Sequence, residues 1–117
     1  MKTFKDLVDA AKARIREITI DEVRALEGRA TIVDVREEAD WKLGHVPGAK
    51  HLSRGVLELR ADKELPDRDA PIVLYCGGGS RSALGTDVLQ EMGYTNVRSM
   101  AGGFRGWKAA GNPTETE

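Results

Sequence analysis

The chain has 117 residues, 40% of them hydrophobic and 32% charged, and its 18 basic and 19 acidic residues give a net charge of −1. This length fits one domain with one core, and the charge balance gives no reason to expect nucleic acid or an anionic membrane as a partner. No run approaches the roughly 18 apolar residues of a membrane span, and the N-terminus lacks the apolar core of a signal peptide, so we expect a cytoplasmic protein.

The first predicted element is an amphipathic helix within residues 1–16. Its apolar residues recur at three- and four-residue spacing, as Phe4, Leu7, Val8, Ala11 and Ile15. Such an apolar stripe needs a partner, which is either the helix's own domain or a second copy of the chain, so a homodimer is one expectation. The main domain is predicted at residues 17–113, and residues 114–117 are predicted to be a disordered tail.

Short strands and helices alternate along the main domain. The strands are predicted at residues 18–20, 31–35, 50–52, 72–75 and 96–100. The helices are predicted at residues 21–27, 39–43, 53–59 and 83–92, with a last one that starts near residue 101 and ends near residue 111. Thr19 and Glu22 fit a capping box for the first of these helices, and the polar, proline-broken residues 61–70 are predicted to form a surface loop. This alternation predicts an α/β fold, with a parallel sheet and helices on both faces.

The strand at residues 72–75 leads directly into the only cysteine, Cys76, and three glycines. The carboxyl ends of parallel strands are where ligands bind in such folds. The glycines can turn several amides toward one point, and Ser80 or Ser82 can cap a following helix whose positive end faces the same point. With the guanidinium of Arg81, these groups predict a lowered pKa for the Cys76 thiol. Cys76 is therefore predicted to be an anionic nucleophile, and the alternative is a buried structural cysteine.

Other polar residues lie near the predicted strand ends. Asp34 and Arg36 either hold neighbouring loops by hydrogen bonds or take part in catalysis. His45 and His51 match no usual zinc spacing, and a lone cysteine cannot form a multi-thiolate site. We expect His45 to donate to a backbone carbonyl, and we expect neither a metal nor a cofactor.

Four segments follow one another in a fixed order. They are residues 34–37 (DVRE), 44–49 (GHVPGA), 76–82 (CGGGSRS) and 101–107 (AGGFRGW). Together they resemble the signatures of the rhodanese family of sulfurtransferases, and the resemblance covers residues 17–112. Residues 53–58 (SRGVLE) are also similar to the single-domain polysulfide-sulfurtransferase branch, whose known members include a homodimer.

The resemblance implies a central sheet of five parallel strands and a ping-pong reaction. In that reaction Cys76 takes a sulfane sulfur from thiosulfate or polysulfide as a persulfide and passes it to cyanide or a thiol. The implied donor-binding residues are Gly77, Gly78, Gly79, Ser80, Arg81, Arg36 and Arg54. The absence of a second cysteine fits this chemistry, because a resolving thiol would discharge the persulfide internally.

Two other functions stay open at the level of sequence. Cysteine phosphatases and arsenate reductases also hold a thiolate in a backbone nest, but five residues separate their cysteine from the arginine, and only four separate Cys76 from Arg81. A persulfide carrier or sensor without turnover would use the same cysteine, since a fold alone does not fix its chemistry.

Overall fold

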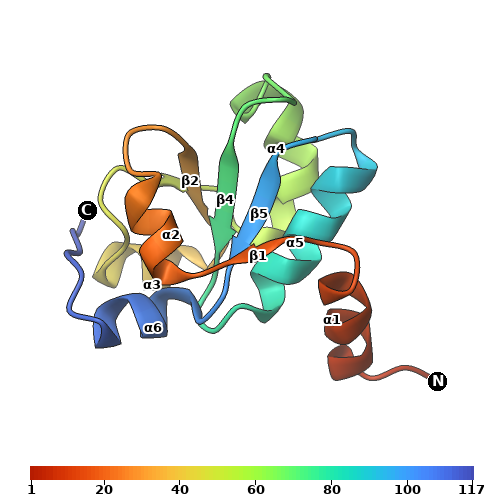
Figure 1. Cartoon of the computed structure of the whole chain (residues 1–117), viewed down its shortest axis with the longest axis horizontal. Helices are drawn as coiled ribbons and strands as arrows, with labels where there is room; N and C mark the ends of the chain where they lie inside the picture. Colours follow the sequence, from red (N-terminus) through yellow and green to blue (C-terminus); the bar gives the residue numbers. More distant parts are fainter.

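A computed structural model describes all 117 residues, and it contains one sheet of five parallel strands between two layers of helices (Figure 1). The strands are β1 (Glu17–Ile18), β2 (Thr31–Asp34), β3 (Lys50–His51), β4 (Ile72–Tyr75) and β5 (Val97–Met100). Their order across the sheet is β1-β5-β4-β2-β3, and every neighbouring pair is parallel. The predicted five-stranded parallel α/β fold is thereby confirmed.

Strand β4 lies at the centre of this sheet. It pairs with β2 on one side, where Asp34 is opposite Tyr75, and with β5 on the other. All four of its residues are buried. Because side chains alternate across a strand, Ile72 and Leu74 face one core cluster, whereas Val73 and Tyr75 face the other.

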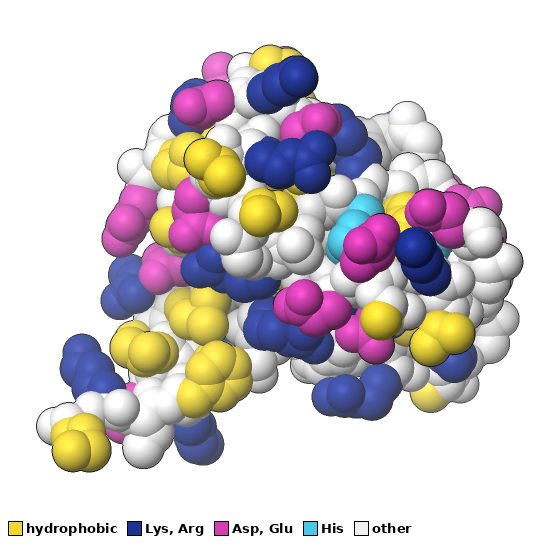
Figure 2. All heavy atoms as spheres, turned by 180° about the vertical axis from the view of Figure 1, so that it is seen from behind, with side chains coloured by type: hydrophobic (Ala, Val, Ile, Leu, Met, Phe, Trp, Pro, Cys, Tyr) yellow, Lys and Arg dark blue, Asp and Glu magenta, His cyan; other side chains and the backbone are white.

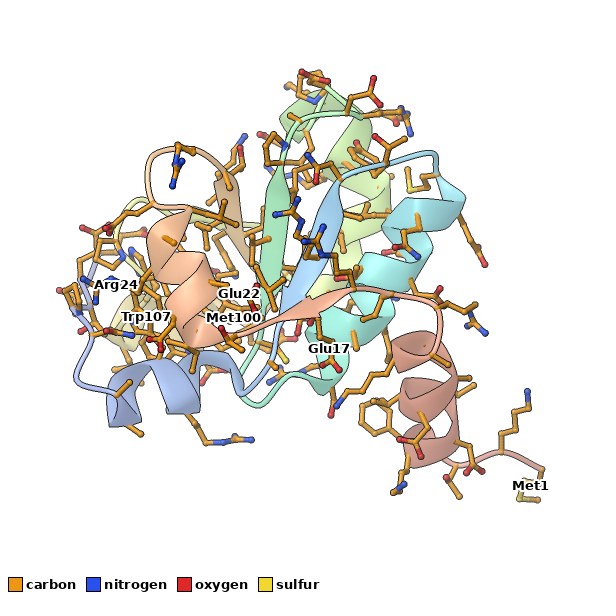
Figure 3. The ribbon with its side chains drawn as sticks, in the orientation of Figure 1. Met1, Glu17, Glu22, Arg24, Met100 and Trp107 are labelled. Carbon is orange, nitrogen blue, oxygen red and sulfur yellow. The ribbon has the colours of Figure 1, made fainter.

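Helices cover both faces of the sheet. They are α1 (Phe4–Lys12), α2 (Ile20–Ala25), α3 (Glu38–Leu43), α4 (Leu57–Glu64), α5 (Ser80–Glu91) and α6 (Gly103–Ala109), with a 3₁₀ turn η1 (Arg54–Val56). Helices α1, α4 and α5 lie on one side and α2 and α6 on the other (Figure 1). Met100 and Trp107 fill the space between the sheet and α6 (Figure 3). No helix combines the length and the apolar character that crossing a membrane requires.

Local signals explain several element boundaries. The predicted capping box is confirmed, because the Thr19 hydroxyl accepts from the Glu22 amide and the Glu22 carboxylate accepts from the Thr19 amide. The prediction of a loop over residues 61–70 is wrong at its start, because α4 continues to Glu64. Ala61 and Leu65 extend the buried face of that helix and accept hydrogen bonds from the Tyr94 hydroxyl at 3.1 and 2.6 Å.

The tail after residue 113 differs from its predicted disorder. Glu115 pairs with His45 through two backbone hydrogen bonds of 2.9 Å, and its carboxylate accepts from the Gly48 amide at 3.0 Å. The turn that begins at His45 presents backbone groups with no partner in the sheet, and the tail supplies those partners.

The N-terminal helix α1 packs against α5 of its own domain and is shorter than predicted. Val8 and Ala11 are buried in this contact. Arg14 fixes it from outside by donating to both carboxylate oxygens of Asp87, at 3.0 and 2.6 Å. The opposite side of α1 stays open, with Phe4 57% and Leu7 48% exposed. Hydrophobic side chains gather over this end of the molecule when it is seen from behind (Figure 2).

Candidate active site

Cys76 follows the carboxyl end of the central strand and is 1% exposed. The three glycines after it turn back around the sulfur, so that the Gly79 amide donates to Sγ at 3.0 Å. Gly79 has a φ of +109°, which residues with a side chain rarely adopt. The sequence thus forms the predicted cradle because glycine stands where the chain must reverse.

Neither Ser80 nor Ser82 caps helix α5, contrary to the prediction. The N-cap is Gly79, and no side chain accepts from the first turn. The Ser82 hydroxyl instead lies 3.5 Å from Sγ of Cys76 and 2.8 Å from the hydroxyl of Ser99, both within hydrogen-bonding distance. Ser82 and Ser99 are both fully buried, so the sulfur ends a short chain of hydroxyl groups inside the protein.

These contacts determine the charge state of Cys76. Burial raises the pKa of its thiol, but hydrogen bonds from the Ser82 hydroxyl and from the amides of Ser82, Gly79 and Gly78 lower it more, so the pKa lies below its ordinary value. The direction agrees with the prediction from sequence. A cysteine in this environment exists as the nucleophilic thiolate over a wider pH range than a free cysteine does.

The start of helix α6 closes the loop from the other side. The Phe104 amide donates to the Cys76 carbonyl at 2.7 Å, and the Arg105 amide donates to the Gly77 carbonyl at 3.1 Å. A Cβ on Gly103, whose φ is +59°, would lie 2.6 Å from backbone atoms of Cys76 and Gly77. The glycine at the start of α6 therefore lets the first amides of the helix reach the cysteine loop.

Two arginines flank the same loop. A Cβ on Gly77 would lie 3.3 Å from Nη2 of Arg81 and 3.3 Å from Nη1 of Arg105, and a Cβ on Gly78 would have to displace Nη2 of Arg105. Neither guanidinium forms an ion pair within the chain. Arg81 was a candidate from sequence, whereas Arg105 was not.

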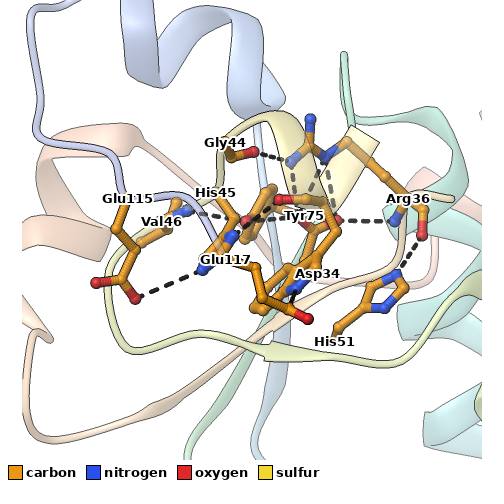
Figure 4. A network of polar contacts seen from close by, with 10 residues as sticks. Asp34, Arg36, Gly44, His45, Val46, His51, Tyr75, Glu115 and Glu117 are labelled. Carbon is orange, nitrogen blue, oxygen red and sulfur yellow. Dashed lines mark hydrogen bonds and ion pairs between the residues drawn. The ribbon is translucent and has the colours of Figure 1, made fainter. Parts of the chain in front are cut away.

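Arg36 belongs to a buried network at the ends of β2 and β4 (Figure 4). Its guanidinium donates to the Asp34 carboxylate at 2.8 to 3.1 Å and to the Gly44 carbonyl at 2.6 Å. The Tyr75 hydroxyl donates to Asp34 at 2.7 Å and accepts from the Val46 amide at 3.1 Å. Burial and the Asp34 carboxylate raise the pKa of Tyr75, which keeps this hydroxyl protonated. Asp34 therefore holds neighbouring loops together, the structural one of its two predicted roles.

Arg54 lies beside α5, with its Cδ 3.7 Å from the position that a Cβ on Gly85 would occupy. It donates to Glu58 at 2.6 Å and lines a hollow together with Leu7 of α1 and Leu84 of α5. The structure thus brings Cys76, residues 77–80 and Arg81 together, and it leaves Arg36 and Arg54 engaged by carboxylates of their own.

The two histidines are held by backbone carbonyls. Nδ1 of His45 lies 2.9 Å from the Trp41 carbonyl oxygen, as expected for His45, and Nε2 of His51 lies 2.8 Å from that of Arg36. Trp41 also stacks on the His45 ring, with 3.4 Å between the ring centroids. No three histidine, cysteine, aspartate or glutamate side chains come together as a set of metal ligands.

Sequence reasoning missed Ser99, Gly103 and Arg105 as parts of the site. Ser99 had one signal, because a hydroxyl on the buried face of a strand needs a polar partner. Gly103 carried the signal of a glycine pair before a helix. Arg105 carried only its place in residues 101–107, since an exposed arginine on a helix usually faces only solvent.

The chain matches one protein family over most of its length. Residues 19–110 match the family model described as the Rhodanese-like domain. The thiosulfate sulfurtransferase GlpE of Haemophilus influenzae is 37% identical over 103 residues, which cover 86% of this chain and 95% of the relative.

Two solved structures are similar over nearly the whole chain. A protein of unknown function from Rhodopseudomonas palustris, described as a possible tyrosine phosphatase, has a TM-score of 0.91 and 32% identity, with 98% of this chain and 96% of that one covered. The polysulfide-sulfur transferase homodimer of Wolinella succinogenes has a TM-score of 0.82 and 32% identity, with 97% and 88% covered. Because the family model matches residues 19–110 and the cysteine loop is closed by the first amides of α6, the chain belongs to the rhodanese family.

Proposed function

We propose that the protein transfers a sulfane sulfur from thiosulfate or polysulfide to a thiol or cyanide through a persulfide on Cys76. The observation that carries this proposal is the hydrogen bond from the Gly79 amide to Sγ, made inside a loop of three glycines. An amide that stabilises the thiolate can also stabilise the terminal sulfur of a persulfide, because both are compact anions.

The chemistry needs no general base at the cysteine. The Sγ thiolate attacks the sulfane sulfur of the donor, a new S–S bond forms, and the donor's S–S bond breaks with its electron pair on the leaving group. An incoming thiolate then attacks the persulfide sulfur and regenerates the Cys76 thiolate. Since Cys76 is only 1% exposed, the donor reaches it when the loop or the flanking arginines move aside.

The relatives support both donors. One relative is named a thiosulfate sulfurtransferase, and one structural neighbour is a polysulfide-sulfur transferase. Arg81 beside the loop is the donor-binding cation that we propose. The charges of Arg36 and Arg54 are largely offset by Asp34 and Glu58, so we propose that these two residues support the site from a distance.

A cysteine phosphatase is the second candidate, because the R. palustris neighbour is described as a possible tyrosine phosphatase. Against it stands the loop length, with four residues between Cys76 and Arg81. A shorter loop fits one sulfur atom better than a tetrahedral oxyanion. A carrier or sensor would keep the persulfide but would release its sulfur slowly.

Intact-protein mass spectrometry tests the proposal. We expect the native chain to gain one sulfur atom on incubation with thiosulfate or polysulfide, to lose it with dithiothreitol, and to show no gain as Cys76→Ser. Rapid discharge to cyanide or a thiol separates the enzyme from the carrier. Absence of any gain, together with aryl phosphate turnover that is lost in Cys76→Ser, would establish the phosphatase instead.

A further inference from the structure

Two guanidinium groups converge over one point of the cysteine loop. Arg81 and Arg105 each place a nitrogen 3.3 Å from the position that a Cβ on Gly77 would occupy. They come from different helices, α5 and α6, and neither is neutralised by a carboxylate of the chain. Like charges held so close repel each other, and an anion between them removes the repulsion.

We propose that Arg81 and Arg105 form an anion clamp that holds the sulfonate group of a sulfur-oxyanion donor of the thiosulfate class. This inference rests on the proposed sulfurtransferase function and adds Arg105 as a specificity-determining residue. A guanidinium donates through a planar fork that matches two oxygens of one oxyanion. Two such forks suit a sulfonate, which has three equivalent oxygens.

The clamp supplies positive charge at the donor, which the transfer step needs because both reactants are anions. Thiosulfate is a dianion and Cys76 is a thiolate, so the two reactants repel each other. When Sγ attacks, the Sγ–S bond forms, the S–S bond of thiosulfate breaks, its electron pair leaves with sulfite, and no proton moves. Negative charge grows on the sulfonate group during this step, so cations at that group stabilise the transition state more than the bound donor.

The backbone fixes Arg105 to the loop that it flanks. Its amide donates to the Gly77 carbonyl at 3.1 Å, and the amide of the preceding Phe104 donates to the Cys76 carbonyl at 2.7 Å. The backbone that carries Arg105 is therefore tied to the backbone of the nucleophile, while its guanidinium can turn aside to admit the donor. A donor without a compact oxyanion gains less from this arrangement, so the clamp favours thiosulfate over a long polysulfide chain.

Alkylation of Cys76 tests the clamp without relying on sulfur transfer. Iodoacetate and iodoacetamide react in the same way with a thiolate and differ in the carboxylate. We expect Arg105→Ala to lower the iodoacetate rate relative to the iodoacetamide rate by about tenfold, the lower end for a lost charge-assisted hydrogen bond. The kcat/KM for thiosulfate falls by a similar factor, and Arg105→Lys keeps most of both. The matched control is Arg29→Ala, an exposed arginine just before β2 at the opposite end of the sheet.

The outcomes separate the clamp from the function on which it rests. An unchanged ratio of the two rates in Arg105→Ala contradicts the clamp, even in a protein that thiosulfate loads. An equal fall of both rates also contradicts it, because Arg105 would then act on the thiolate and not on the anion. A lowered ratio in a protein that no donor loads supports the anion site and contradicts the proposed sulfurtransferase function.

Discussion

Two buried serines, Ser82 and Ser99, influence the charge state of Sγ of Cys76. In the thiolate state, Ser82 donates to Sγ of Cys76 and is free to accept from Ser99. Among the hydrogen bonds to Sγ, that of the Ser82 hydroxyl contributes most to the lowered pKa of Cys76. We therefore expect Ser82→Ala to raise this pKa and Ser99→Ala to raise it by less, because Ser99 acts only through Ser82.

The pH dependence of iodoacetamide alkylation measures this effect. The rate rises with pH as the thiol ionises, so a raised pKa moves the midpoint to higher pH and slows alkylation a few-fold near neutrality. Ser53→Ala, in a half-buried serine without a side-chain hydrogen bond in its turn, serves as the control and keeps the native midpoint. A Ser99→Ala profile that coincides with the native one would show that Ser99 does not position Ser82.

At this scale the sequence predicts the nucleophile better than its surroundings. Cys76 and its glycines are adjacent in the chain, so the local rules for strand ends and glycine turns predict their arrangement. Ser99 and Arg105 reach the site through β5 and α6, and no local pattern says where their side chains end. Ser82 was assigned to a helix cap, the common role of a serine at that position, but the sulfur is the group it contacts.

At the scale of elements, the junction between the cysteine loop and α6 depends on Gly103. A methyl group there would lie 2.6 Å from backbone atoms of Cys76 and Gly77, closer than real Cβ contacts allow. We expect Gly103→Ala to push α6 away from the loop, to destabilise the protein by about 3 kcal/mol, and to abolish persulfide formation. Urea unfolding and intact mass measure the two effects.

Gly111→Ala is a matched control for this variant. Gly111 also has a positive φ, +78°, but nothing lies within 4 Å of the Cβ it would carry. Its replacement costs only the backbone strain, about 1 kcal/mol, and leaves persulfide formation intact. Equal costs in the two variants would mean that Gly103 serves only its backbone angle and that α6 does not press on the loop.

Elements with a strong local signal were predicted well, and elements that depend on distant partners were not. Strand β4 begins and ends as predicted because its apolar run is bounded by Pro71 and Cys76. The end of α4 is polar in sequence, but Ala61 and Leu65 there are buried, and their carbonyls accept hydrogen bonds from the Tyr94 hydroxyl. The contact of Glu115 with His45 spans 70 positions of the chain and leaves no trace in the local composition of the tail.

At the scale of the whole molecule, helix α1 satisfies one of its two predicted contacts and leaves room for the other. Val8 and Ala11 pack on α5, and the ion pair between Arg14 and Asp87 holds the helix there. Phe4 and Leu7 remain 57% and 48% exposed on the other side. A second copy of this chain offers an identical apolar face as a partner.

We therefore propose that α1 forms a homodimer contact, and Leu7→Glu tests it. A buried carboxylate in an apolar interface is costly, so we expect the native chain to have twice the monomer mass of 12.8 kDa by light scattering and Leu7→Glu to have the monomer mass. Leu59→Glu is the control, because Leu59 is 82% exposed on α4, away from α1, and this variant stays dimeric. A native chain with the monomer mass would contradict the dimer, and a monomeric Leu59→Glu would show that the interface lies on α4 and not on α1.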